Sequence, residues 1–472
     1  MPQKAIFWFR QDLRLSDNPG LHKACIKHNV LPIYIHSEND KIGAASKVWL
    51  YHSLKNLNNN LNNKLNLYYG NPKDIILELI KKHEVSLVCW NRCYEPNRIS
   101  EDKIIKSEIK KLNIECHSYN ASLLWEPWEV LKNDGTPYKV FTPFYKKGCL
   151  KAPAPRNLIP KIKTDNIFKD SNNKINLEDL KLLPSKKEKN WDNELISLWN
   201  VGEKASCNKL KNFIDNGINN YKNGRDFPSL NSISKLSPHL HFGEISPHQI
   251  WHAVQNKIAE NNIDIQNAEH FLSEIGWREF SYYLLFHFNK LPTKNFQSKF
   301  DSFPWGNNKS YLEAWKKGKT GFPIVDAGMR ELWQTGFMHN RVRMIVASFL
   351  VKNLLIDWRC GAEWFWDCLF DADLANNSAS WQWVAGSGAD AAPYFRIFNP
   401  ILQGEKFDKT GEYTKKYVPE LKNIPDKYLF KPFEAPENIL EKANIKLGKN
   451  YPMPIVDLKK SRDFALEAYK NI

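Results

Sequence analysis

The sequence lacks the long apolar runs that membrane proteins need. No stretch of its 472 residues approaches the roughly 18–20 apolar residues required to span a bilayer, and residues 1–4 lead directly into a strand-like segment. It also lacks a C-x-x-C pair, because its eight cysteines are scattered. A disulfide scaffold is therefore excluded, and no metal site is predicted. We expect a cytoplasmic protein with reduced thiols and no membrane association.

A G-x-G-x-x-G loop is also missing after the first apolar segment, which excludes the usual nicotinamide dinucleotide fingerprint. The N-terminal part nevertheless alternates short apolar runs with amphipathic stretches, and the runs cover residues 5–9, 31–35, 65–69 and 85–90. Strands that alternate with helices at this spacing predict βαβ units and a parallel sheet. We expect a doubly wound, Rossmann-like α/β domain over residues 1–130.

The pattern changes after this domain. Residues 131–195 are irregular, rich in lysine and punctuated by proline, which predicts an inter-domain linker. Its lysines are interpreted as a solvated face rather than a binding site. Helical periodicity then dominates, for example over 268–289 and 328–355. A larger all-α domain is therefore predicted over residues 196–472.

The net charge and the number of tryptophans bear on which ligands the protein could bind. Lysine and arginine number 67 against 52 acidic residues, a net charge of +15, and such an excess favours polyanions such as nucleic acid. Seventeen tryptophans are present. A tryptophan-rich core would account for many of them, so the number alone does not define a site.

The most unusual stretch runs from Asp371 to Trp383. It combines two carboxylates two residues apart, amides, small residues and two tryptophans. Buried carboxylates need partners, and Arg341 and Arg343 are the obvious ones. One interpretation is a polar pocket walled by indoles, which suits a planar cofactor rich in hydrogen-bonding groups. The alternative is a helix and turn packed by structural tryptophans around an ordinary ion pair.

Four segments carry a resemblance to a known family. They are FWFRQDLRLSDN (7–18), EIGWREF (274–280), KTGFPIVDA (319–327) and WQW (381–383) continuing to NP (399–400). In this order they resemble the photolyase/cryptochrome family, and within it bacterial cyclobutane pyrimidine dimer photolyases. The resemblance extends from residue 5 to about residue 430. It implies an antenna-binding α/β domain followed by a helical catalytic domain that binds FAD and DNA.

The resemblance implies a deoxyribodipyrimidine photo-lyase. In such an enzyme reduced FAD (FADH⁻), excited by near-UV or blue light, donates an electron to a flipped cyclobutane pyrimidine dimer in UV-damaged DNA. It further implies a monomer in a bacterial cytoplasm, associated with the nucleoid when on DNA. Asn97 and Arg98 occupy the place of a methenyltetrahydrofolate antenna, although Arg98 replaces an acid found in some relatives. A deazaflavin or no antenna are the alternatives.

Carried over by position, the FAD contacts are Tyr221, Ser234, Leu236, Ser237, Arg278, Asn340, Arg343, Asp371, Asp373 and Asn377. Asn377 would face flavin N5, where plant cryptochromes carry an aspartate. Ile233 departs from the threonine that is common in the family, so one side-chain donor to the phosphates is absent.

Trp381, Trp358 and Trp305 match the tryptophan chain that photoreduces the flavin, and core packing is their alternative role. The implied DNA contacts are Arg225, Glu274, Trp277, Asn340, Arg341, Met344, Trp383 and Arg396. Trp277 and Trp383 would stack on the flipped pyrimidines. Glu274 would hydrogen-bond the dimer and act in catalysis.

Two positions narrow the lesion. Six-four photolyases carry catalytic histidines where this chain has Asn340 and Met344, so a proton donor for that reaction is missing. Cyclobutane dimers are therefore the expected lesion. The scattered cysteines disfavour an iron–sulfur branch. A blue-light cryptochrome is the alternative function, and a flavin electron-transfer protein without DNA is a third.

Overall fold

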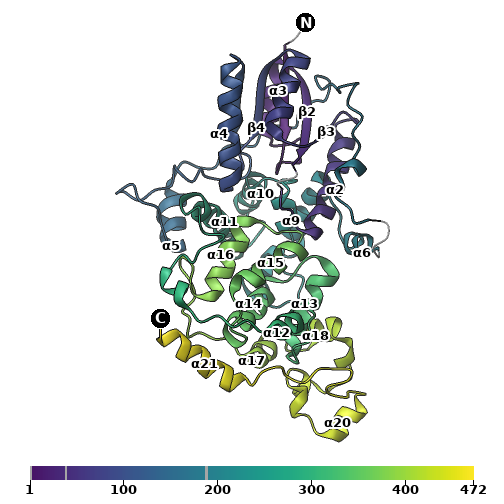
Figure 1. The fold of residues 1–472 in the computed structure, drawn as a ribbon, viewed down its shortest axis with the longest axis vertical. Helices are drawn as coiled ribbons and strands as arrows, with labels where there is room; N and C mark the ends of the chain where they lie inside the picture. The colour runs from purple at the N-terminus through teal and green to yellow at the C-terminus, as the bar shows by residue number, and fades with distance from the viewer. Residues whose placement is uncertain (1–2, 38–39, 186–189) are drawn as a thin grey trace. The chain divides into compact units, whose positions relative to one another are not determined.

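The computed structural model describes residues 3–37, 40–185 and 190–472 (Figure 1). The chain forms two compact units. Unit 1 comprises Met1–Asn219 and Ser234–Asn289, and unit 2 comprises Asn220–Ile233 and Lys290–Ile472. The predicted domain boundaries near residues 130 and 195 follow the change from α/β to helical pattern and stay a prediction.

Unit 1 begins with a five-stranded parallel sheet. Its strands are β1 (Lys4–Phe9), β2 (Asn29–His36), β3 (Asn66–Tyr69), β4 (Val85–Asn91) and β5 (Glu115–Tyr119). They lie in the order β3-β2-β1-β4-β5, and every pairing is parallel. The predicted doubly wound α/β fold is confirmed. The sequence analysis did not find β5, because its edge sequence ECHSY has little apolar alternation.

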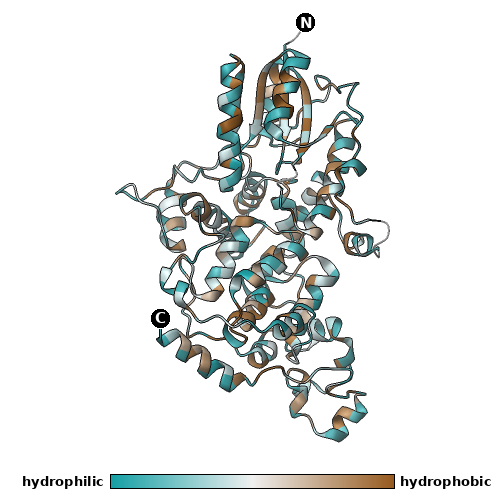
Figure 2. Cartoon of the chain, viewed as in Figure 1, coloured by the Kyte–Doolittle hydropathy of each residue, from teal (hydrophilic) through white to brown (hydrophobic). Residues whose placement is uncertain are grey.

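Alternate residues of each strand point to opposite faces of the sheet. In β1, Ile6 and Trp8 pack with α3 (Pro72–His83) and α4 (Pro96–Lys111). Phe7 faces the other way, toward α1 (Pro19–Lys27), where a Cβ at Gly20 would lie 2.8 Å from its ring. The strands are largely brown in the hydropathy colouring of Figure 2, as expected for strands covered on both faces.

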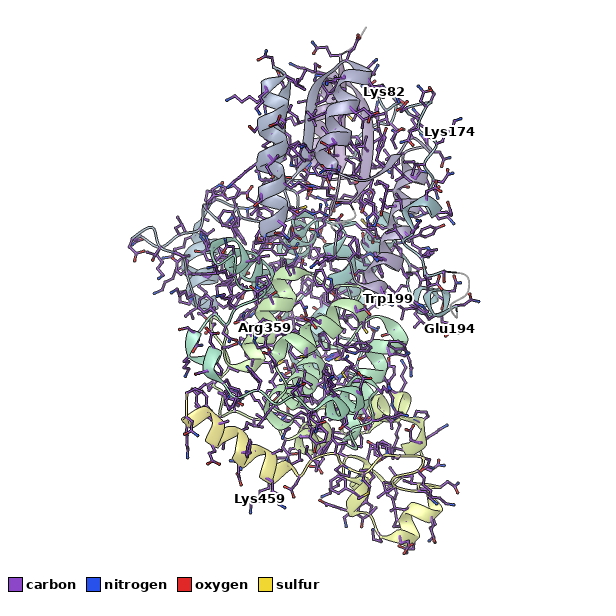
Figure 3. The ribbon with its side chains drawn as sticks, in the orientation of Figure 1. Lys82, Lys174, Glu194, Trp199, Arg359 and Lys459 are labelled. Atoms are coloured by element: carbon purple, nitrogen blue, oxygen red, sulfur yellow. The ribbon has the colours of Figure 1, made fainter. Side chains whose placement is uncertain are left out.

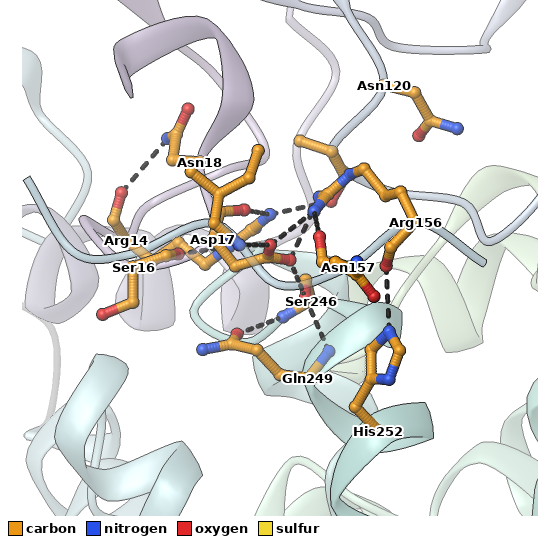
Figure 4. Close-up of polar contacts among 12 residues, drawn as sticks. Arg14, Ser16, Asp17, Asn18, Asn120, Arg156, Asn157, Ser246, Gln249 and His252 are labelled. Carbon is orange, nitrogen blue, oxygen red and sulfur yellow. Dashed lines mark hydrogen bonds and ion pairs between the residues drawn. The ribbon is translucent and has the colours of Figure 1, made fainter. Parts of the chain in front are cut away.

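The N-terminal motif has a structural role in unit 1 (Figure 4). Arg14 donates hydrogen bonds to the carbonyl oxygens of Gly243 and Ala121. The Asp17 carboxylate accepts hydrogen bonds from Arg156 and from Ser246. Burial alone would raise the pKa of Asp17, but these hydrogen bonds and the charge of Arg14 lower it below its ordinary value. The motif thus ties the end of β1 to three later segments of the same unit.

Helices complete unit 1. Helix α2 (Ala44–Asn60) connects β2 and β3. After β5 the chain forms a short α5 (Phe141–Pro143), a π-helical turn, Phe144–Gly148, and a 3-10 turn, Cys149–Lys151. The remaining helices are α6 (Trp191–Ser197), α7 (Glu203–Asn216), α9 (Ser237–His241), α10 (Pro247–Ala259) and α11 (Ile265–His287). The long α11 agrees with the periodicity predicted over 268–289.

Unit 2 is helical. Its helices are α8 (Tyr221–Gly224), α12 (Lys309–Lys316), α13 (Pro323–Thr335), α14 (Asn340–Ser348), α15 (Trp358–Cys368), α16 (Leu374–Ala385), α17 (Pro400–Phe407), α18 (Glu412–Tyr417), α19 (Asp426–Leu429), α20 (Glu437–Lys442) and α21 (Leu458–Lys470). Buried side chains of α13, α14, α15 and α16 form its main core. No helix in the described ranges is long and apolar enough to cross a membrane.

One prediction about these helices is wrong. The apolar periodicity over 328–355 predicted a continuous helix, but α13 ends at Gly336, which adopts a left-handed φ of 65°. The next helix, α14, begins after His339, whose side chain caps it by accepting a hydrogen bond from the Arg341 backbone N–H. Glycine ends helices in this conformation because it has no Cβ to clash. The break places Asn340 and Arg341 at a helix N-terminus.

Candidate active site

In unit 1 the predicted DNA contacts Glu274 and Trp277 and the predicted FAD contact Arg278 lie on α11. Trp277 and Arg278 follow Glu274 by three and four positions, so both lie on the same face of the helix as Glu274. All three side chains are half-buried. The helix therefore presents a carboxylate and an indole side by side, as the resemblance implies.

One face of the Trp277 indole is already covered. Phe141 stacks on it with ring centroids 3.8 Å apart and planes 11° from parallel, and Tyr145 is parallel to Phe141 at 5.5 Å. Gly276 allows the Tyr145 ring to pack against α11, because a Cβ at residue 276 would lie 2.6 Å from that ring. The glycine of the EIGWREF motif therefore has a packing role. The sequence analysis missed Phe141, which lies in the predicted linker.

Arg278 is engaged within unit 1. Its Nη1 donates to the Ser122 carbonyl oxygen at 2.7 Å and lies 3.4 Å from Glu279, and the guanidinium covers the Tyr282 ring. Glu279 is 3% exposed and accepts the backbone N–H of Leu124. Burial raises the pKa of Glu279 to about 7. The family motif contains Glu279, but no role was predicted for it.

The predicted phosphate cradle of unit 1 is a turn leading into α9. The Ser234 hydroxyl accepts a hydrogen bond from the Leu236 backbone N–H at 3.4 Å. Lys235 between them has a left-handed φ of 51°, and Ser237 is exposed at the first position of α9. The turn presents hydroxyl and backbone groups that suit an anion.

In unit 2, Tyr221 and Arg225 lie together at α8. The guanidinium of Arg225 is 5.4 Å from the Tyr221 ring centroid. Asp226, one residue on, accepts a hydrogen bond from Arg341 at 2.6 Å. The same Arg341 covers the Phe407 ring at 4.5 Å. Asp226, for which no role was predicted, therefore links Arg341 to the segment that carries Tyr221 and Arg225.

Of the two arginines expected as partners of the carboxylates, Arg343 forms an ion pair with Asp371 in unit 2. Nη2 of Arg343 lies 2.9 and 3.1 Å from the two Asp371 oxygens, and its Nε donates to the Met338 carbonyl oxygen at 2.7 Å. The Asp371 side chain is 5% exposed and the Arg343 side chain 24% exposed. The guanidinium edge is therefore fixed while part of it stays accessible.

The carboxylate-and-amide stretch forms the start of α16. Asp373 caps the helix by accepting the Asn376 backbone N–H at 2.8 Å. One turn on, Nδ2 of Asn377 donates to the Ala362 carbonyl oxygen of α15 at 3.0 Å. This bond orients the amide of Asn377 and leaves its Oδ1 and second N–H for a ligand. Both alternatives raised by the sequence are thus compatible with the same geometry.

The two tryptophans of WQW point to opposite sides of α16, because residues two apart do not share a helix face. Trp381 is 3% exposed and contacts Phe365, whereas Trp383 is half-buried. Between them, the fully buried Gln382 donates to the Leu291 carbonyl oxygen at 2.7 Å and accepts the Phe296 backbone N–H. No role was predicted for Gln382. Its two hydrogen bonds fix the loop after residue 290.

Two of the three predicted relay tryptophans, Trp381 and Trp358, are buried, and Trp305 is partly exposed. Trp381 lies against α15 at Gly361, where a Cβ would clash with its ring, and Trp358 is one turn earlier on the same α15 face. Trp358 is 1% exposed and donates to Asn295 at 2.9 Å, and Trp305 is half-buried. Arg359, which Figure 3 labels, covers the Trp358 ring.

Arg396 lies in an exposed segment of unit 2, beside Phe395, which is 66% exposed. The buried Lys352 donates to the Arg396 carbonyl oxygen at 3.2 Å and covers the Tyr394 ring. Burial, with the nearby charge of Arg396, lowers the pKa of Lys352 to about 8. The sequence did not predict this contact, because Lys352 is a single lysine in an otherwise apolar helical stretch.

Unit 2 also holds buried polar atoms without protein partners. His339 Nε2 and Arg341 Nε, both adjacent to Asn340, make no hydrogen bond within the described residues. Burial lowers the pKa of His339 to about 3, so its ring is neutral at physiological pH. Unpaired buried donors and acceptors need a partner, and these two therefore fit a bound polar ligand. No group of three potential metal ligands occurs in residues 3–37, 40–185 and 190–472.

Comparison with known proteins identifies the family. Residues 5–161 match the DNA photolyase family profile, and residues 271–471 match the FAD binding domain of DNA photolyase. A deoxyribodipyrimidine photo-lyase of Agrobacterium fabrum is 47% identical over 98% of this chain and 97% of its own. Cryptochrome-2 of Arabidopsis thaliana is 36% identical over 99% of this chain and 79% of its own.

A solved structure agrees. A bacterial class III photolyase from Agrobacterium tumefaciens superimposes with a TM-score of 0.95 at 45% identity, covering 100% of this chain and 98% of that one. The chain belongs to the photolyase/cryptochrome family. The predicted fold class and the predicted enzyme, an FAD-binding deoxyribodipyrimidine photo-lyase, are confirmed.

Proposed function

We propose that the protein repairs cyclobutane pyrimidine dimers in UV-damaged DNA in light, with reduced FAD (FADH⁻) as the electron donor. The observation that carries the choice of lesion is the first turn of α14. Asn340 is exposed and Met344 half-buried there, and neither side chain titrates. A six-four photoproduct needs a proton donor at this place, whereas splitting of a cyclobutane dimer by electron transfer and return does not.

The residues present fit FAD. In unit 2 the Arg343–Asp371 pair offers a neutralised, partly accessible edge, the Asn377 amide retains free hydrogen-bonding capacity, and the buried His339 Nε2 is unpaired. The proposed FAD contacts are Tyr221, Asn340, Arg343, Asp371, Asp373 and Asn377 of unit 2 and Ser234, Leu236, Ser237 and Arg278 of unit 1. Bound FAD supplies light absorption and one-electron transfer.

The proposed role of Asn377 is to hydrogen-bond flavin N5. Its amide is neutral and is already oriented by the Ala362 carbonyl oxygen. An amide accepts or donates without a change of charge, so it is compatible with the reduced flavin. Ile233 supplies no hydroxyl to the cradle, and the backbone groups of residues 234–237 would serve instead.

Trp381, Trp358 and Trp305 form the proposed path for photoreduction. Trp381 and Trp358 are buried, whereas Trp305 is half-buried, so Trp305 is the member of the three that solvent reaches. They also pack the core or its edge. The relay and the packing roles are compatible.

The proposed substrate contacts are those that the family resemblance implies. Glu274 and Trp277 on α11 and Trp383 on α16 would hydrogen-bond and stack on the flipped pyrimidines, whose extrusion from the duplex costs a few kcal/mol. Asn340 and Met344 would contact the same bases. Arg225, Arg341 and Arg396 would meet phosphates or the space vacated in the duplex.

An antenna folate, methenyltetrahydrofolate, is proposed near the start of α4. Glu95 Oε2 is buried there without a partner among the described residues, and Asn97 is exposed. Arg98 forms ion pairs with Asp40 and Glu101, so its charge is already compensated. We place the enzyme in the cytoplasm, bound to DNA as a monomer.

The lesion is tested with two oligonucleotides, one carrying a cyclobutane thymine dimer and one a six-four photoproduct. The reduced enzyme is illuminated with each, and intact bases are measured by chromatography. We expect repair of the cyclobutane dimer alone. Repair of the six-four product would contradict the role given to Asn340 and Met344. Photoreducible flavin with no repair of either lesion would favour a cryptochrome.

A further inference from the structure

A hollow on unit 1 is lined mainly by lysine. Its volume is about 480 Å³, and its lining residues are Lys132, Asn133, Asp134, Tyr138, Lys147 and Lys151. The three lysines are exposed, and the positive charge of Lys132 contributes to lowering the pKa of Asp134. Asp134 is occupied locally, since it accepts hydrogen bonds from the N–H and hydroxyl of Thr136. The hollow therefore carries a net positive charge.

The segment that bears these lysines is fixed to α11. Phe141 stacks on Trp277, and Tyr145 fits against Gly276. The Tyr138 backbone N–H also donates to the Tyr283 hydroxyl at 2.9 Å. Figure 1 shows α5 beside α11. Three contacts thus anchor the lysines to the helix that carries the proposed lesion-stacking tryptophan.

We propose that this lysine-lined hollow is a DNA-backbone contact surface, which binds phosphates that flank the lesion. The proposal rests on the proposed function, because it takes Trp277 as the marker of the lesion position. Exposed lysines that outnumber their acidic neighbours attract phosphates by charge and by release of counterions. The solvated face expected from sequence thus becomes a binding surface, since the fold gathers lysines from residues 132 to 151 around one concavity.

Phosphate contacts and base contacts have different experimental signatures. Phosphate contacts carry no sequence information and strengthen the binding of damaged and undamaged duplex alike. Each contact contributes about 0.9 to the slope of log K against log salt concentration on B-form DNA. Removing lysines of the hollow should therefore lower the salt slope on both duplexes without changing the preference for the dimer.

The test is a triple variant, Lys132→Gln, Lys147→Gln and Lys151→Gln. The matched control changes three exposed lysines of α3 and α4, namely Lys81→Gln, Lys103→Gln and Lys110→Gln. Both variants lose the same net charge. Dark binding to a fluorescent duplex, with and without one thymine dimer, is measured by anisotropy over a series of salt concentrations. Flavin content and circular dichroism verify that each variant is folded.

We expect the hollow variant to lower the salt slope by up to about 2.7 on both duplexes, and to weaken binding roughly tenfold or more at low salt. Its preference for the dimer and its repair yield per bound dimer should equal those of the wild type. Equal slopes for the hollow variant and the control variant would overturn the proposal. A wild type without preference for the dimer would count against the proposed function, while the slopes on undamaged duplex would still test the hollow.

Discussion

The ion pair between Arg343 and Asp371 supports a quantitative prediction. Asp371→Asn keeps the shape of the side chain but removes its charge. The Asp371 side chain is 5% exposed, so Arg343 loses a desolvated partner at 2.9 Å and retains its bond to the Met338 carbonyl oxygen. Breaking a fully buried pair costs about 3–5 kcal/mol. Because the Arg343 side chain is 24% exposed and water solvates it in part, we expect a loss of about 2–3 kcal/mol.

The assay is urea unfolding of the purified holoprotein, followed by flavin release and tryptophan fluorescence. Asp426→Asn is the matched control, because its partner Lys415 forms an exposed pair in the same unit, with Asp426 65% exposed. Exposed pairs contribute at most about 1 kcal/mol. We also expect Asp371→Asn to purify with less flavin than the control. Equal destabilisation of the two variants, with full flavin content in both, would show that the Arg343–Asp371 pair contributes no more than an exposed pair.

Three further predictions concern other side chains. Trp381→Phe should abolish photoreduction of oxidised flavin but spare repair by pre-reduced enzyme, and loss of both with flavin bound would contradict the relay. Phe141→Leu should weaken dimer binding up to about tenfold, since its stack on Trp277 contributes about 0.5–1.5 kcal/mol; unchanged dimer affinity in anisotropy would contradict it. Burial lowers the pKa of Lys352 to about 8. The free energy of unfolding of the wild type should therefore rise relative to that of Lys352→Met between pH 8 and pH 10.5. Parallel pH profiles of the two proteins in urea unfolding would exclude a destabilising charge on Lys352.

The sign of the Lys352 effect follows from proton binding. The unfolded chain holds the lysine proton more tightly than the folded chain does, so the buried ammonium destabilises the fold below pH 8. This cost disappears as the pH rises toward the ordinary value of the amine, 10.5. The Met variant has no such proton and lacks that dependence.

The sequence predicted the parts of the fold that repeat a local pattern. The apolar strands β1 to β4 and the long α11 are evident from periodicity, because each buries a regular face. Strand β5 was missed, since an edge strand needs few apolar residues. The break between α13 and α14 was also missed, because Gly336 interrupts an apolar pattern that otherwise continues on both sides.

The candidate site was predicted mainly from the family motifs, and the residues that support it were not. Phe141 lies more than 130 positions before Trp277 in an irregular segment, and no local signal connects them. Lys352 and Gln382 act through backbone carbonyl oxygens that only the folded chain brings near. Such contacts depend on tertiary structure. A cation beside Asp371 was predictable because a buried carboxylate needs one, and the structure selects Arg343 from the two candidates, Arg341 and Arg343.

The most direct test of the proposed function is light-dependent repair. The protein is purified in the dark, reduced, and illuminated at near-UV to blue wavelengths with an oligonucleotide that carries one cyclobutane thymine dimer, while the flavin spectrum is recorded. We expect loss of the dimer in light and none in the dark control. Bound, reduced flavin with the dimer intact after illumination would contradict it.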